Sequence, residues 1–176
     1  SFNKNIFYPF GHYSSSNKSL QDFDNILYAG SLTRYFRNKE SDFNIEPYIK
    51  TSDKLDKKFN SILKQFNEKK RIGISWKSVF NIFGSLKSLE LNNFSKLYSQ
   101  DRIFINLQYG NVIEEINNFI ESGRNIFSFD NVDLFDDFDS LISILKNLDV
   151  FVTVSNSTAH FAGALGVPTI LICPKK

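Results

Sequence analysis

The sequence predicts an α/β domain built on a doubly wound parallel sheet. Five short apolar runs alternate along the chain with segments whose apolar residues recur at helical spacing. The runs are almost continuous rather than alternating, which is typical of strands that are covered on both faces. In chain order the predicted strands are 71–76, 102–108, 125–129, 150–154 and 168–173.

Residues 1–50 contain few periodic runs and are predicted to be irregular, with a short strand at 5–10 and a linker that ends near Pro47. A helix is predicted next, with Ser52 as its N-cap. Its apolar residues share one face: Leu55, Phe59, Ile62, Leu63 and Phe66. The helix is expected to end at the basic run 69–71, whose charge suits the helix dipole.

The strands in the middle of the chain are followed by helical patterns. A loop that carries Gly84 leads to a short predicted helix near 92–98. After the second strand, the segment 111–123 places its apolar residues on one face. Gly123 fits the C′ position that ends this helix.

Two more helices are predicted in the last third of the chain. The first spans 140–148 and takes Asp139 as its N-cap. The second takes Asn156 or Ser157 as its N-cap and runs to about Leu165, and Gly166 ends it. The alternation of strand and helix is therefore complete up to the fifth strand.

Charge and composition limit the classes of partner. The net charge of +2 gives no argument for nucleic acid or for an acidic membrane surface. No apolar run approaches the ~18 residues that a membrane span needs, and no signal-peptide pattern opens the chain. The single cysteine, Cys173, cannot form a disulfide within the chain and is expected as a buried apolar residue. These features favour a cytoplasmic protein.

Several motifs that carry well-known chemistry are absent from the sequence. No G-x-G-x-x-G follows the first predicted strand and there is no Walker A motif, so dinucleotide and P-loop sites lose their main support. No G-x-S-x-G elbow and no cluster with metal-ligand spacing occurs. We therefore expect no cofactor and no metal. The acidic run 130–139 is either a divalent-ion site or a solvated surface, and the solvated surface is favoured because the spacing matches no known metal-binding loop.

The most informative segment is "SNSTAH" (155–160), which follows the fourth predicted strand. In a doubly wound sheet, ligands bind at the carboxyl ends of the strands. The first amides of the helix that follows have no internal partner and carry partial positive charge. Ser155, Asn156, Ser157 and Thr158 add polar groups at the same place. The segment is therefore either a phosphate cradle or a plain helix cap.

Three further residues are candidates at this edge. Lys77 directly follows the first strand and is either a cation that neutralises phosphate or a solvated lysine. Ser88 comes back toward the sheet as the next helix begins. His160 lies one turn into the last helix, where it either meets a phosphate or sugar or satisfies a buried hydrogen bond.

Four segments, and a fifth upstream, carry a family likeness. They are "GISWK" at 73–77, "NLQ" at 106–108, "DDFDSL" at the start of 136–149, "VSNSTAHFAGALGVP" at 154–168 and "GSLTRYFR" at 30–37. Together they resemble the donor-binding half of two-domain (GT-B-type) glycosyltransferases. The likeness is greatest to bacterial glycosyltransferases fused to tetratricopeptide repeats and to the ADP-heptose:lipopolysaccharide heptosyltransferases.

The resemblance implies roles for five of the candidate residues. Ser157, Thr158 and the helix amides would hold the diphosphate of the donor, and Lys77 would help to neutralise it. Gln108 would meet the base or ribose, and His160 would face the donor sugar or the phosphates.

The resemblance also implies the organisation of the protein. Residues 1–50 would be a remnant of the N-terminal domain with a linker, and 51–176 the nucleotide-sugar-binding, Rossmann-like, C-terminal half of a GT-B fold. The chain begins without Met and ends just after an apolar run. We therefore expect part of the functional unit to lie outside it, including the catalytic base and a possible tetratricopeptide-repeat domain.

These inferences predict an inverting, metal-independent glycosyltransferase. It would bind a nucleotide-diphosphate sugar and transfer the sugar to a hydroxyl of a glycan, a lipid-linked sugar or a protein. One departure supports an alternative: Ser155 stands where the family usually has Asp, so a carboxylate is missing. The alternative is a non-catalytic binding or scaffolding module that keeps the fold. An epimerase of the same architecture would need a set of acidic and His residues that the sequence does not show.

Overall fold

The computed structural model describes residues 31, 33–43, 46–78 and 84–173. The chain divides into two units, Ser1–Ile45 and Glu46–Lys176. Within the described residues, no helix is long and apolar enough to cross a membrane.

The first unit contributes two short elements. They are helix α1 (Thr33–Phe36) and the 3-10 helix η3 (Glu40–Asp42), and neither buries a side chain. The strand predicted at 5–10 lies outside the described residues. The interpretation of 1–50 as a domain remnant and linker stays a prediction.

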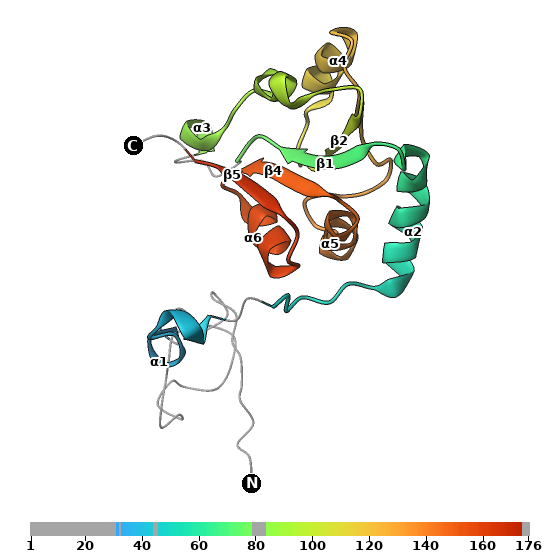
Figure 1. Ribbon diagram of the computed structural model, residues 1–176. Coiled ribbons are helices and arrows are strands. Elements are labelled where there is room, and N and C mark those ends of the chain that lie inside the picture. Colours follow the sequence, from blue (N-terminus) through green and yellow to red (C-terminus); the bar gives the residue numbers. More distant parts are fainter. Residues whose placement is uncertain (1–30, 32, 44–45, 79–83, 174–176) are drawn as a thin grey trace, which may run out of the picture. The chain divides into compact units, whose positions relative to one another are not determined.

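The second unit is built on a five-stranded, all-parallel sheet with the order β3-β2-β1-β4-β5 (Figure 1). The strands are β1 (Lys70–Ser75), β2 (Arg102–Asn106), β3 (Ile126–Phe127), β4 (Val150–Val154) and β5 (Thr169–Ile172). Ile72 at the centre of β1 pairs with Phe104 of β2 and Val150 of β4, which fixes the register on both sides. The predicted doubly wound parallel sheet is confirmed.

The strand order reverses between β1 and β4. The chain runs from β1 outward to β2 and β3, and then returns to place β4 and β5 on the other side of β1. The loops that leave the carboxyl ends of β1 and β4 therefore diverge, and this switch point is where open α/β sheets bind ligands.

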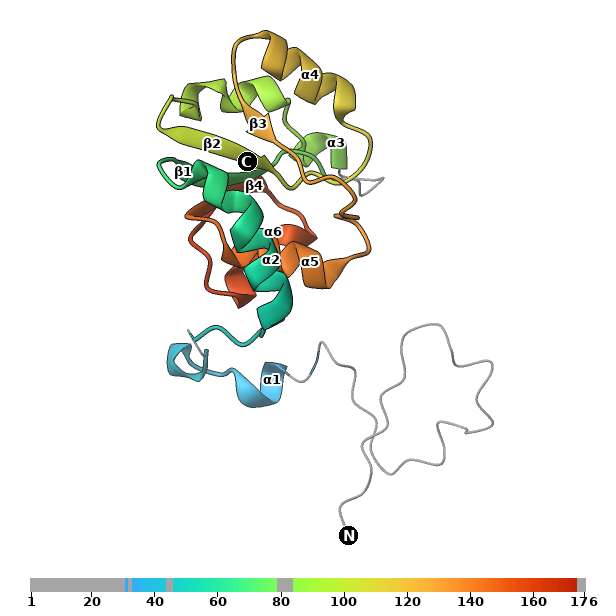
Figure 2. The ribbon, with the colours of Figure 1, turned by 90° about the vertical axis from the view of Figure 1, so that its right-hand side faces the viewer.

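Helices cover both faces of the sheet (Figure 2). One face carries α2 (Asp53–Leu63), α5 (Phe138–Lys146) and α6 (Ser157–Ala164). The other carries the 3-10 helix η5 (Leu91–Leu97) and α4 (Ile113–Glu121). Alternate residues of β2 supply the two cores: Ile103 and Ile105 face the first, and Phe104 faces the second. This alternation explains why the strand is apolar throughout.

The first predicted helix ends earlier than the sequence pattern indicates. Helix α2 stops at Leu63 and continues as a 3-10 turn, η4 (Lys64–Phe66). The basic run 69–71 does not close it, because Lys70 and Arg71 already belong to β1. Ser52 occupies the N-cap position of α2 but makes no capping hydrogen bond through its side chain.

Two other local predictions are wrong. Gly84 does not lie in a loop but begins a short helix, α3 (Gly84–Lys87). The N-cap of α5 is Asp137 rather than Asp139, because the helix already begins at Phe138. The Asp137 side chain accepts a hydrogen bond of 3.0 Å from the amide of Ser140.

The ends of the other helices follow the predictions. Gly123 and Gly166, with φ of 84° and 71°, lie just beyond α4 and α6. Asn156 is the N-cap of α6 and accepts a hydrogen bond of 3.1 Å from the amide of Ala159. These caps fix the path of the chain on both sides of the "SNSTAH" segment.

Strand β5 lies at the edge of the sheet and is less covered than the apolar sequence predicts. Ile170 and Leu171 are 55% and 48% exposed. Cys173 follows the strand and is exposed, so its predicted burial is wrong. The apolar pattern identifies the strand but not its place at the edge.

Candidate functional site

The loops at the carboxyl ends of β1, β2 and β4 bring most of the predicted site residues to one edge of the sheet. Ser155 is half-buried between β4 and α6, while Ser157 and His160 are exposed on the first turn of the helix. Thr158 is almost fully buried, at 1% exposure. Asn156 Oδ1 accepts from the amide of Ala159. The two amides that precede Ala159 in α6 have no acceptor within the helix, because they belong to its first turn.

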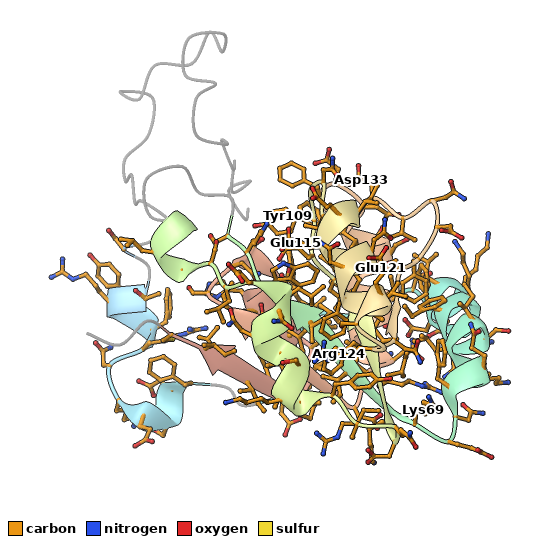
Figure 3. All side chains as sticks on the ribbon, turned by 90° about the horizontal axis from the view of Figure 1, so that it is seen from above. Lys69, Tyr109, Glu115, Glu121, Arg124 and Asp133 are labelled. Carbon is orange, nitrogen blue, oxygen red and sulfur yellow. The ribbon has the colours of Figure 1, made fainter. Side chains whose placement is uncertain are left out.

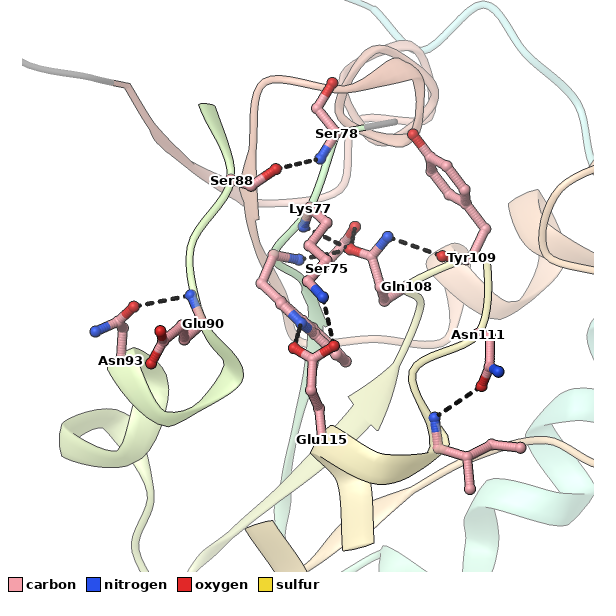
Figure 4. A network of polar contacts seen from close by, with 12 residues as sticks. Ser75, Lys77, Ser78, Ser88, Glu90, Asn93, Gln108, Tyr109, Asn111 and Glu115 are labelled. Carbon is pink, nitrogen blue, oxygen red and sulfur yellow. Dashed lines mark hydrogen bonds and ion pairs between the residues drawn. The ribbon is translucent and has the colours of Figure 1, made fainter. Parts of the chain in front are cut away.

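Gln108 lies just beyond β2 and organises the end of β1 (Figure 4). Its Oε1 accepts hydrogen bonds from the Ser75 hydroxyl (3.0 Å) and from the backbone amides of Trp76 (2.8 Å) and Lys77 (2.7 Å). Its Nε2 donates to the Tyr109 carbonyl at 3.0 Å. The side chain is 2% exposed, so a ligand would have to compete with all these bonds. Its contact with a base or ribose stays a prediction.

Further buried polar groups extend this arrangement along the edge. Asn156 Nδ2 donates to Ser75 Oγ at 2.9 Å. On the other side, Asn106 Oδ1 accepts from the amide of Gln108 (2.9 Å), and its Nδ2 donates to Ser128 Oγ (3.2 Å). Sequence reasoning missed Ser75 and Asn106. The available signal was a polar residue at the last position of each of two strands, directly after the buried apolar residues of that strand.

Lys77 is paired with a carboxylate that the sequence did not identify. Its Nζ forms an ion pair and hydrogen bond with Glu115 Oε1 of α4. The other oxygen, Oε2, accepts from the indole Nε1 of the fully buried Trp76 at 2.8 Å. Figure 4 shows Glu115 directly below the end of β1, where both donors converge on it. Glu115 therefore fixes the position of the one predicted cation of the site.

This ion pair lines an open cavity between η5 and α4. The cavity has a volume of about 630 Å³. Its lining residues are Lys77, Glu90, Leu91, Asn92, Glu114, Glu115, Asn118, Phe119 and Ser122. Three of these carry carboxylates and one carries an ammonium, so the free cavity does not attract anions by charge alone.

Ser88 is held by the loop that follows β1. Its hydroxyl donates to the Gly84 carbonyl at 2.7 Å and accepts from the amide of Ser78 at 3.1 Å. The amide of Leu89 also donates to the Trp76 carbonyl, at 2.7 Å. These bonds return the chain to the end of β1, and they engage the Ser88 hydroxyl in structure rather than leaving it free for a ligand.

The acidic segment before α5 has its own structural bonds. Asp133 Oδ1 accepts from the amides of Phe135 (2.8 Å) and Asp136 (3.1 Å). Hydrogen bonds from the side chain and backbone of Ser140 hold the pKa of Asp137 below its usual value. No group of three or more His, Cys, Asp or Glu residues in the described part of the chain could hold a metal ion.

A second cavity, of about 570 Å³, lies at the opposite edge of the sheet, around the first residue of β1. Figure 3 shows its Lys69 far from Tyr109 and Glu115, which mark the carboxyl edge. Its polar groups are largely bonded to one another. For example, Asp149 Oδ2 accepts from the amide of Arg71 at 2.7 Å. The Arg71 side chain in turn donates to Asn67 Oδ1 at 2.6 Å.

The architecture defines a class of fold: the chain has the Rossmann-like fold of one half of a GT-B glycosyltransferase. The structure of E. coli ADP-heptose lipopolysaccharide heptosyltransferase II is similar to it with a TM-score of 0.52 and 14% sequence identity. This likeness covers 77% of the present chain and 43% of the heptosyltransferase chain. At 14% sequence identity, this likeness establishes the fold alone.

Comparison of sequences adds one relative. Protein FlbA of Caulobacter vibrioides is 30% identical over 110 residues, which are 58% of this chain and 18% of FlbA. The chain therefore spans about a fifth of FlbA and less than half of the heptosyltransferase. No protein-family model matches the sequence.

Proposed function

We propose that the chain is the C-terminal, donor-binding half of an inverting glycosyltransferase and binds a nucleotide-diphosphate sugar. The observation that carries this proposal is the position of the α6 N-terminus at the switch point of a GT-B-like sheet. Free helix amides at that position favour a diphosphate. The hydroxyls of Ser157 and Thr158 are proposed to add donors to the same cradle.

The proposed chemistry is stabilisation of the leaving nucleoside diphosphate. Negative charge grows on the diphosphate as the bond to the sugar breaks, and fixed amide dipoles stabilise that charge without reorganising. We propose that the Lys77 ammonium leaves its ion pair with Glu115 when the donor binds and pairs with a phosphate oxygen instead, which adds a positive charge next to the diphosphate. The base that deprotonates the acceptor hydroxyl is expected in the N-terminal domain, as the family resemblance implies. The acceptor is a glycan, a lipid-linked sugar or a protein.

Calorimetry and thermal-shift measurements with ADP, UDP, GDP, CMP and their sugar conjugates test donor binding. ADP and ADP-sugars come first because the similar solved structure is named as an ADP-heptose enzyme. A ligand at a hundredfold excess over its Kd stabilises the native state by about 2.7 kcal/mol. The proposal predicts a selective binder, and it fails if the folded wild-type protein binds none of these compounds.

Two substitutions localise the binding. Lys77→Ala and Thr158→Ala are expected to weaken it. Lys70→Ala is the matched control for Lys77→Ala, because Lys70 also faces a carboxylate, at 4.0 Å, but at the opposite edge of the sheet. Equal losses in the two lysine variants would indicate a non-specific effect of charge.

A non-catalytic binding or scaffolding module is the second candidate. Two observations favour it: Ser155 replaces the usual Asp, and Lys77 is already paired with Glu115. Product analysis on the full-length protein separates the candidates. An enzyme releases nucleoside diphosphate from the donor in the presence of acceptor, whereas a module binds without turnover. Ser155→Asp should raise turnover only if the site is catalytic.

A further inference from the structure

A row of hydrogen-bonded polar residues crosses the carboxyl edge of the sheet, and we call it the relay. Its bonds join side chains, except that Gln108 donates to Asn106 through its backbone amide. Its members are Asn156, Ser75, Gln108, Asn106 and Ser128. They follow or end β4, β1, β2 and β3, which are consecutive neighbours in the sheet. The relay therefore connects the strands across the switch point rather than along any one of them.

The direction of every bond in the central part of the relay is determined. Asn156 Oδ1 accepts from the backbone amide of Ala159, so its Nδ2 must be the group that faces Ser75. Gln108 Oε1 accepts from two backbone amides, so Nε2 must face away. Backbone amides can only donate, which fixes both side-chain amide orientations.

The Ser75 hydroxyl connects the side chains of Asn156 and Gln108. This hydroxyl has one proton, which it donates to Gln108 Oε1, and it accepts the proton of Asn156 Nδ2. Ser75 is fully buried, and Gln108 and Asn156 are 2% and 8% exposed. Water competes little with bonds in such surroundings, so breaking one leaves a buried group without a partner.

Asn156 and Gln108 each hold backbone next to a group that the proposed function assigns to the diphosphate. On one side of Ser75, Asn156 orders the first turn of α6 through the amide of Ala159. On the other side, Gln108 orders the backbone amides of Trp76 and Lys77. The geometry points to Ser75 as a positioning residue that fixes the N-terminus of α6 relative to Lys77. This inference rests on the proposed function only for its consequence in binding.

Amide hydrogen exchange, followed by NMR on the second unit within the whole chain, tests the coupling without any ligand. Ser75→Ala is expected to speed exchange at the Ala159 amide about fivefold, the factor that the loss of one ordinary hydrogen bond brings. Asn156→Ser keeps an oxygen for the Ala159 amide but cannot reach Ser75. For this variant the measured quantity is the exchange rate of the Lys77 amide, on the Gln108 side of Ser75, and this amide should exchange faster than in wild type.

Thr153→Val is the matched control. Thr153 is fully buried in β4, and its hydroxyl donates to the Val154 carbonyl at 3.0 Å rather than to the relay. It should leave the Ala159 and Lys77 amides unchanged. The double variant Ser75→Ala/Asn156→Ser should exchange no faster than the more affected single variant, because both remove the same bond.

A titration with ADP, UDP and GDP, and with the matching nucleosides, tests the consequence in binding. Ser75→Ala should lower the affinity for the nucleoside diphosphate that wild type binds by about fivefold. The affinity for the matching nucleoside should not change. The inference is overturned if amide exchange changes only beside the substituted residue, or if Thr153→Val changes it equally. It is also overturned if Ser75→Ala lowers the affinities for the diphosphate and for the nucleoside by the same factor. Absence of binding to wild type would overturn the proposed function, while the exchange result still judges the coupling.

Discussion

The ion pair between Lys77 and Glu115 makes a direct prediction about diphosphate binding. If Lys77 exchanges Glu115 for a phosphate oxygen, the pair must be broken each time the donor binds. Glu115→Gln removes the negative charge but keeps an oxygen that can accept from the buried Trp76 indole. The variant should therefore bind the donor more tightly without loosening the end of β1.

The size of the effect follows from the exposure of the pair. The Lys77 and Glu115 side chains are 40% and 29% exposed, so solvent screens much of their attraction. Pairs of this kind contribute about 0.5–1 kcal/mol. At 1.4 kcal/mol per factor of ten, the dissociation constant should fall by about two- to fivefold.

The control is Glu114→Gln, which removes the same charge from the preceding residue of α4. Glu114 is exposed and lines the same cavity. Calorimetric titration of wild type and both variants with the selective nucleoside diphosphate separates the specific pair from the general charge of the helix. The reasoning is refuted if Glu115→Gln binds no more tightly than Glu114→Gln.

Caps and turns of the fold give further predictions, each measured by urea denaturation. Asp137→Ala should cost about 1 kcal/mol of stability, whereas Asp139→Ala should change it by less than about 0.5 kcal/mol. Folding lowers the pKa of Asp137, so its ionic contribution to stability is complete above about pH 5 and is lost as the pH falls through the folded-state pKa. The stability difference between Asp137→Ala and wild type should therefore narrow toward about pH 3, and a constant difference would contradict this. Gly166→Ala should destabilise by about 1–3 kcal/mol, because φ is 71° and a Cβ would approach Pro47 Cγ to 2.7 Å. A Cβ at Gly163 would meet no atom within 4 Å, so Gly163→Ala should instead stabilise α6 by up to about 1 kcal/mol. Equal changes in stability for Gly163→Ala and Gly166→Ala would refute the argument from the positive φ of Gly166.

The sheet could be predicted from the sequence because its signal is local. The centre of each strand is a run of mostly apolar residues, and glycines with positive φ end α4 and α6 where the pattern stops. The cap of α5 was missed because Asp137 and Asp139 both precede its apolar face, and only the helix start decides between them. The exposure of β5 was missed because an apolar run does not reveal that its strand lies at an edge.

The candidate site could be predicted only in part. The proposed cradle at 155–158 is contiguous in sequence, and the role of Asn156 as a cap follows from its position before α6. The partner of Lys77 is Glu115, which lies on another helix and belongs to no local pattern. Gln108 was assigned to the ligand, but Oε1 accepts from residues of β1 and the turn after it. Contacts between distant segments depend on the strand order, which one sequence does not specify.

The measurement that tests the central claim most directly is an NMR titration of the ¹⁵N-labelled chain with ADP, UDP and GDP. The account predicts that the diphosphate that binds shifts the amides of Ser157, Thr158 and Lys77, at the carboxyl edge of the sheet. The basic residues 69–71 at the opposite edge should not respond. Shifts confined to 69–71, or no shifts with any of the three compounds, would contradict the assignment of a donor-binding site to this fold.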